Sequence, residues 1–170
     1  MIEKTEIHRH TIAVLVDNEF GVLARVVGLF SGRGYNIESL TVAKVDEKEN
    51  LSRITIVTTG TMMVIEQIKA QLNRLVPVHS IADLTLDGPS VEREMALVKV
   101  EGTGEKRVEA LRMADIFRAS AVDVTESSLV FEVTGDREKV KAFVALMEPL
   151  GEVEVCRTGI VALKRGHETI

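Results

Sequence analysis

The sequence predicts an α+β protein made of two consecutive βαββαβ units. In each half, short segments with apolar residues at every second position alternate with longer segments of helical spacing. The two halves also match by counting, because Gly60 and Gly135 each precede an apolar helical stripe by the same steps. These stripes are Ile65, Ile68, Leu72 and Leu75 in the first half and Val140, Phe143, Met147 and Leu150 in the second.

The first unit is predicted to begin with a strand over 11–16. Both faces of this strand are apolar, so we expect a central strand that is covered on both sides. A helix over 23–30 follows, then strands over 40–43 and 52–58, a helix over 65–75 and a strand over 78–86. A polar hairpin loop, 46–50, joins the two middle strands.

The second unit repeats this order. Strands are predicted over 95–100, 121–125 and 129–133, helices over 108–117 and 140–150, and a last strand or strands over 153–163. Each unit is thus expected to be ferredoxin-like, with four antiparallel strands and two helices on one face. The predicted division is a first domain over 1–86, a turn-rich linker over 87–90 and a second domain over 91–170.

The other face of the first sheet needs a cover. The residues expected on this face of the sheet are too apolar to be exposed to water. They are Ala13, Leu15, Thr41, Ala43 and Val57. We expect the second domain and a second subunit to provide the cover, and therefore a homodimer or a larger assembly.

Composition limits the classes of function. The chain has 170 residues, of which 45% are hydrophobic and 28% charged, and its net charge of −5 argues against a nucleic-acid partner. No apolar run reaches the roughly 20 residues of a membrane helix, and residues 1–10 lack a signal-peptide core. The single cysteine, Cys156, excludes an internal disulfide. We expect a cytoplasmic protein.

The turn over 17–21 is the sharpest candidate site. It is expected to end a strand and to start a helix, and free N–H groups at a helix N-terminus attract a small anion such as a carboxylate. Asn18 adds hydrogen-bonding groups, and Gly21 permits close approach to the backbone. An ordinary capping turn accounts for the same residues, because Asn and Asp favour helix N-caps.

A second candidate is the turn over 32–36, which could place Asn36 beside a ligand bound by a neighbouring subunit. A helix C-cap followed by a turn is the alternative interpretation. The segment 102–104, Gly-Thr-Gly, matches neither the P-loop nor the dinucleotide-binding spacing, so a strand–helix loop is predicted.

The remaining reactive residues suggest no catalytic site. His8 and His10 share one strand face but lack further ligands, so a solvated face is expected rather than a metal site. Cys156 is interpreted as a small buried hydrophobe. The segment 92–94 is interpreted as a solvated start of a strand or an interface rim, and 157–159 as a turn or a partner contact. No G-x-S-x-G, H-E-x-x-H or P-loop motif is present.

Two motifs carry a family resemblance: Asp17-Asn18-Glu19-Phe20-Gly21 and Arg33-Gly34-Tyr35-Asn36-Ile37-Glu38-Ser39. With their neighbours in 15–42, they closely resemble the regulatory (small) subunit of acetolactate synthase, also called acetohydroxyacid synthase. Further segments that fit this family are 51–53, 66–68, 91–94, 97–100, 116–118, 122–124 and 157–159. The resemblance extends from about residue 10 to about residue 166.

The resemblance implies an N-terminal ACT domain and a ferredoxin-like second domain. It implies a dimeric subunit that has no enzymatic activity or cofactor of its own. Such a subunit binds and stimulates a catalytic large subunit, in which thiamine diphosphate, magnesium and FAD are expected. It also confers feedback inhibition by valine, in some cases by leucine or isoleucine, on the first shared step of branched-chain amino acid biosynthesis.

In the family, valine lies between the ACT domains of two protomers. The matching effector-binding positions in this sequence are Asn18, Phe20, Gly21, Val22 and Leu23, facing Asn36 and Ile37. Ala43 matches a position whose substitution affects feedback in the family. Phe20 departs from the proline or small residue that is usual there, and Thr61-Met62-Met63 replaces a usual acidic stretch.

Other functions remain open at this stage. One is a free-standing ACT-type amino-acid sensor that controls a different enzyme or a transcription factor. Another is a small enzyme that uses Cys156 or a carboxylate, and a third is a metal-responsive regulator. The sequence does not identify the preferred branched-chain amino acid, its affinity, the stoichiometry of the complex or the residues that contact the catalytic subunit.

Overall fold

A computed structural model describes residues 6–170 of the chain. Residues 1–5, which belong to the predicted first domain and to the segment predicted to lack a signal-peptide core, lie outside the described residues. The chain forms two compact units. The first extends to Val91 and is completed by Ile160–Ile170, and the second is Glu92–Gly159.

The first unit has the predicted βαββαβ order. Its elements are β1 (His8–Asp17), α1 (Val22–Gly32), β2 (Ser39–Asp46), β3 (Leu51–Gly60), α2 (Met62–Leu72) and β4 (Val78–Asp83). The strands form one antiparallel sheet in the order β2-β3-β1-β4, so β1 is central, as its two apolar faces predicted. β4 ends three residues before the predicted end, because the N–H groups of Leu86 and Asp87 turn back to the carbonyl of Asp83.

The second unit repeats this order. Its elements are β5 (Ser90–Glu101), α3 (Gly104–Phe117), β6 (Ser120–Val124), β7 (Ser128–Gly135), α4 (Arg137–Met147), the 3₁₀ turn η1 (Glu148–Leu150) and β8 (Glu152–Arg157). The strand order β6-β7-β5-β8 matches that of the first sheet, with β5 in the place of β1. The predicted α+β architecture of two ferredoxin-like units is therefore confirmed.

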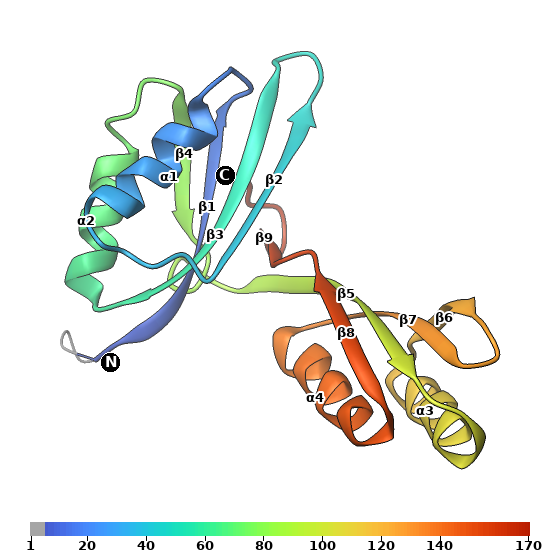
Figure 1. Cartoon of the computed structure of the whole chain (residues 1–170). Coiled ribbons are helices and arrows are strands. Elements are labelled where there is room, and N and C mark those ends of the chain that lie inside the picture. Colours follow the sequence, from blue (N-terminus) through green and yellow to red (C-terminus); the bar gives the residue numbers. More distant parts are fainter. Residues whose placement is uncertain (1–5) are drawn as a thin grey trace. The chain divides into compact units, whose positions relative to one another are not determined.

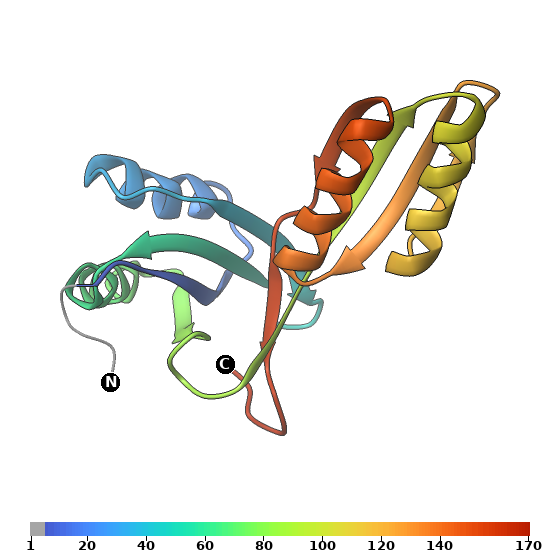
Figure 2. The same ribbon diagram turned by 90° about the horizontal axis from the view of Figure 1, so that it is seen from below.

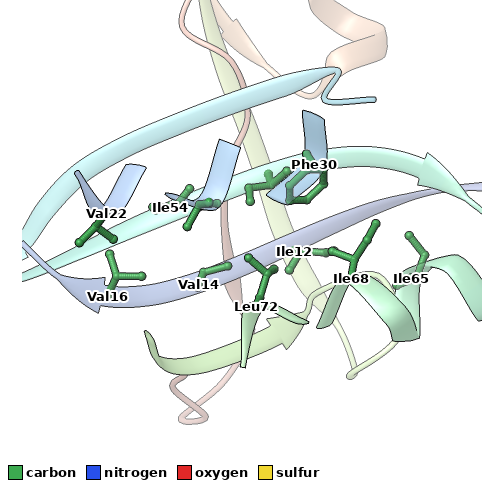
Figure 3. Packing of buried hydrophobic residues seen from close by; sticks show 11 residues of the cluster. Ile12, Val14, Val16, Val22, Phe30, Ile54, Ile65, Ile68 and Leu72 are labelled. Atoms are coloured by element: carbon green, nitrogen blue, oxygen red, sulfur yellow. The ribbon is translucent and has the colours of Figure 1, made fainter. Parts of the chain in front are cut away.

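Two helices cover one face of each sheet, as Figures 1 and 2 show. In the first unit the apolar residues of β1 at every second position meet the buried sides of α1 and α2 (Figure 3). This core contains Ile12, Val14, Val16, Val22, Val26, Phe30, Ile54, Ile56, Ile65, Ile68 and Leu72. The second unit has an equivalent core built around Phe131, Phe143 and Met147.

The C-terminal segment lies differently from the prediction. The expected strand or strands over 153–163 divide into β8 and β9 (Val161–Lys164), with Gly159 at a positive φ of 85° between them. Residues Ile160–Ile170 group with the first unit, whereas the predicted second domain included them. Ile160 and Ala162 are buried against the open face of the first sheet, where their neighbours are Ala13, Val57, Ala82 and Leu84. Part of the cover expected from another domain or subunit thus comes from this segment.

Three predicted surface assignments are wrong. His10 is completely buried, and its Nδ1 lies 2.8 Å from Oδ2 of the equally buried Asp83. Glu94, expected at a solvated start of a strand, is 3% exposed and pairs with Arg157. Cys156, expected to be buried, is exposed. His10 and Glu94 have partners 73 and 63 residues away, so local pattern did not indicate their burial.

Candidate effector-binding site

The helix α1 begins without a side-chain cap. Four residues separate the end of β1 at Asp17 from Val22, and the N-cap residue Gly21 adopts the left-handed conformation with φ 83°. No side chain caps this helix and its first turn contains no acidic residue. The first complete helical bond runs from Arg25 N–H to Gly21 O, at 3.0 Å. The N–H groups that precede it carry the positive end of the helix dipole and suit a small anion.

Asn18 is fixed by a residue that sequence reasoning missed. Its N–H donates to the carbonyl of Asn50 at 2.8 Å, and the Asn50 side-chain amide donates to the Asn18 carbonyl at 3.2 Å. The two side chains are also 3.5 Å apart, from Asn18 Nδ2 to Asn50 Oδ1. Asn50 has a positive φ of 54°, which Asn tolerates better than most residues. The available sequence signal was that Asn50 ends the polar hairpin loop 46–50.

Asp17, the last residue of β1, also has a partner that the sequence did not indicate. Its Oδ1 lies 2.7 Å from Nε2 of His79. Its N–H donates to the carbonyl of Pro77 at 2.9 Å, so β1 and the start of β4 are held together beside the turn. Both side chains are partly exposed. A titratable pair therefore adjoins the residues that precede α1.

The predicted side chains around Gly21 have different surroundings. Phe20 is fully exposed and Leu23 is 41% exposed, so both are available to a ligand or a partner. Val22 is buried in the first core, and its N–H makes a long bond of 3.5 Å to the carbonyl of Glu19. The turn therefore offers backbone donors and an exposed apolar side chain, which suits a ligand with a carboxylate and an aliphatic group.

The second predicted turn lies beyond the other end of α1. The carbonyl of Asn36 accepts a bond of 2.6 Å from Thr58 Oγ1, and the Asn36 side chain is exposed. Ile37 packs at the edge of the first core. An 11-residue helix is about 16 Å long. One protomer therefore does not bring Asn36 and Ile37 to the turn that contains Asn18 and Gly21.

Ala43 lies on the opposite face of the sheet from these turns. It is exposed on β2 and pairs with Arg53 of β3. Thr41 lies two residues before Ala43 on β2. Thr41 and Arg53 both donate hydrogen bonds to the C-terminal segment on the open face. Ala43 is therefore not a neighbour of the α1 N-terminus within one protomer.

Within residues 6–170 there is no group of three or more His, Cys, Asp or Glu side chains that could hold a metal ion. The helices described for this part of the chain are also too short or too polar to cross a membrane. The α1 turn remains the candidate site with the clearest chemistry, namely recognition of a small anion by backbone N–H groups.

Comparison with known proteins identifies the relatives of both units. Residues 12–80 match the family described as "AHAS small subunit-like ACT domain", and residues 93–166 match "Small subunit of acetolactate synthase". The acetolactate synthase small subunit of Aquifex aeolicus is 47% identical over 96% of this chain and 85% of its own length. The isozyme 3 small subunit of Escherichia coli is 47% identical over 94% of this chain and 98% of its own.

A solved structure agrees with these matches. The acetolactate synthase small subunit of Thermotoga maritima is 40% identical, with a TM-score of 0.85 over 95% of this chain and 99% of that chain. Sequence and fold thus agree over nearly the whole length. This chain belongs to the family of acetolactate synthase small subunits.

Proposed function

We propose that this chain is the regulatory subunit of acetolactate synthase, which stimulates the catalytic large subunit and makes it sensitive to feedback by valine. The uncapped start of α1 at Gly21 is the observation that supports an effector site. A valine carboxylate would accept bonds from the N–H groups that begin α1, and Asn18 and Asn36 would supply further donors and acceptors.

The separation of the two turns supports a site shared by two protomers. Because Asn36 lies beyond the far end of α1 from Asn18, the two asparagines can meet at one ligand only if they come from different copies. A homodimer accounts for this requirement. Leu23 and Ile37 would then provide apolar contacts for a branched aliphatic side chain, which favours valine over a charged amino acid.

Catalysis itself is assigned to the partner. Thiamine diphosphate, magnesium and FAD are expected in the large subunit, and the proposed location of the complex is the cytoplasm. Valine changes the activity of the complex only if it binds one arrangement of the subunits more tightly than another. A coupling free energy of about 1–3 kcal/mol is typical of such regulation.

The test is acetolactate formation by the catalytic subunit of the same organism, with and without this chain, across a titration of valine. Parallel titrations with leucine and isoleucine identify the preferred effector. Stimulation that valine reverses supports the proposal. Stimulation without a response to any of the three amino acids rejects the effector assignment but keeps the partner.

An absence of stimulation, with an active catalytic subunit, rejects the regulatory role. Binding of a branched-chain amino acid to the isolated chain, measured by calorimetry, would then favour a free-standing sensor. The same calorimetry on the Gly21→Asp variant shows whether the ligand occupies the α1 turn.

A further inference from the structure

The open face of the first sheet is crossed by Ile160–Lys164, which we call the return segment (Figure 1). Ile160 is 2% exposed and Ala162 5% exposed, so this segment is part of the core of the first unit. Its strand β9 pairs with β5, and Arg165 N–H donates to the carbonyl of Pro89 at 2.8 Å. The return segment is therefore fixed along its length.

Three side chains of the first sheet hold the backbone of the return segment. Ser39 Oγ accepts from Ile160 N–H at 3.0 Å, and Thr41 Oγ1 donates to the Ile160 carbonyl at 2.9 Å. Arg53 Nη2 donates to the Ala162 carbonyl at 2.9 Å. Because these are bonds from particular side chains, the attachment depends on sequence in a way that a strand ladder does not.

The attachment points lie close to the proposed effector contacts. Ser39 begins β2 and follows Asn36 and Ile37 directly along the chain. Residues 39, 41 and 43 share one face of β2 because strand residues alternate between faces. Any displacement of this strand by a ligand at Asn36 would therefore act on Ser39 and Thr41, which hold Ile160.

Arg53 is the charged member of the attachment. Burial lowers the pKa of its guanidinium below the ordinary value, and its Nε is buried with no hydrogen-bond partner. Because partial burial of a guanidinium is unfavourable unless its donors are bonded, the bond to the Ala162 carbonyl offsets part of this cost. Arg53 thus favours one position of the return segment.

The other end of the connection is fixed within the second unit. Thr158 N–H donates to the Met95 carbonyl at 3.0 Å, and Met95 N–H donates to Thr158 Oγ1 at 3.1 Å. Arg157 pairs with the buried Glu94. Only Gly159 separates Thr158 from Ile160 along the chain. A displacement of Ile160 would therefore reach Thr158 through a single intervening residue.

We propose that the return segment transmits effector occupancy from β2 of the first unit to strands β5 and β8 of the second, with Ser39 and Thr41 as its positioning residues. This inference rests on the proposed function and adds the route by which the second unit responds. It predicts that the hydroxyls of Ser39 and Thr41 are needed for feedback but not for binding of valine.

The test compares the full-length double variant Ser39→Ala, Thr41→Val with the single variant Thr55→Val. Thr55 pairs with Thr41 across the sheet and lies on the same buried face, but its hydroxyl makes no described bond to the return segment. Three quantities are measured for each: valine affinity of the isolated chain, stimulation of the catalytic subunit, and the ratio of valine affinities with and without that subunit.

For wild type and Thr55→Val we expect the ratio of affinities to lie in the range of about 5- to 150-fold that is typical of allosteric coupling. The double variant should keep the valine affinity of the isolated chain within about threefold, while the ratio falls toward one. Deuterium exchange of the wild type should also show that valine alters exchange of the amides in 160–164.

Each other outcome overturns the inference. If the double variant keeps the wild-type ratio, the return segment does not carry the coupling. If the isolated double variant loses more than about threefold in valine affinity, Ser39 and Thr41 belong to the binding site instead. Unchanged exchange of 160–164 on valine binding also contradicts it, even where the variant is too unstable to assay. If the wild-type chain with the catalytic subunit does not respond to valine, the proposed function is rejected together with the inference.

Discussion

The two units share one fold but differ where the first strand meets the first helix. Four residues join β1 to α1, whereas two residues join β5 to α3. The equivalent backbone bonds are present in both, from Asn18 N–H to Asn50 O and from Gly102 N–H to Ser127 O. Both helices lack a side-chain cap, but the left-handed Gly21 is the N-cap of α1, whereas Thr103 is the N-cap of α3 and the left-handed Gly104 follows it.

In the second unit the shorter loop is packed tightly at Gly102, although a pocket lined by Gly104, Lys106, Arg112 and Leu150 adjoins the start of α3. The turn η1 lies against the loop, and a Cβ added to Gly102 would be 3.1 Å from the carbonyl oxygen of Leu150. A Cβ added to Gly21 would meet nothing within 4 Å. The comparison indicates that loop length, rather than the fold, decides how closely the backbone of each turn is packed.

The largest expected effect tests how tightly the second unit is packed around η1. In Gly151→Ala the new Cβ would overlap the carbonyl oxygen of Glu101, and neither group belongs to a flexible side chain. We expect the free energy of unfolding of the second unit to fall by about 3 kcal/mol or more. Urea denaturation checks this value. A loss below about 1 kcal/mol would show that η1 is loosely packed.

A second test separates a buried from an exposed His–Asp pair in the first unit. Asp83→Ala leaves the buried His10 without its partner, and a loss of about 3 kcal/mol is expected. The matched variant Asp17→Ala removes the partly exposed partner of His79, for which a loss under about 1 kcal/mol is expected. Equal losses in thermal unfolding would contradict the burial of the first pair.

The third test concerns the ligand of α1. Gly21→Asp and Gly21→Asn both place a side chain at φ 83°, which Asp and Asn tolerate better than other residues. Only Asp adds a charge that repels a carboxylate ligand. Valine affinity measured by calorimetry should fall at least tenfold more in Asp than in Asn, which is about 1.4 kcal/mol. Similar affinities would place the carboxylate elsewhere.

The fourth test uses the capped helices. Asp136 Oδ1 accepts a bond of 2.8 Å from Lys139 N–H at the start of α4. Asp136→Ala should lower stability by about 1 kcal/mol because this N–H loses its acceptor. Valine affinity should be unchanged, which separates a structural cap from the uncapped start of α1. A change in affinity would link α4 to the effector site.

The smallest expected effect is a gain. Gly28 lies inside α1, and a Cβ there would meet nothing within 4 Å. Gly28→Ala should therefore raise stability by about 0.5–1 kcal/mol through the higher helix propensity of alanine. Thermal unfolding checks the sign. A loss of stability would mean that another surface, such as a second protomer, packs against this side of α1.

Sequence reasoning recovered what short-range pattern determines. A short run that is apolar on both faces located β1, and helical spacing located α1, α2 and α4, because these patterns reflect local burial. The candidate turn was also predicted, including its position before α1. Asn50 and His79 were missed because they reach this turn from 32 and 62 residues away.

The C-terminal segment shows the same limit more clearly. Residues 153–163 were interpreted as strand structure of the second unit, but Gly159 divides them and the part from Ile160 onward packs on the first unit. Nothing in its alternating pattern distinguishes one sheet from the other. The three bonds that decide between them span 109 to 121 residues.

This arrangement sets an order for folding during synthesis. The residues that complete the first unit, Ile160 and Ala162, are translated only after the whole of Glu92–Gly159. The nascent first sheet therefore leaves the ribosome with an uncovered apolar face, and the second unit has time to fold before that face is closed. A ribosome stalled within the second unit would present this face to chaperones, whereas in the finished chain Ile160 and Ala162 cover part of it.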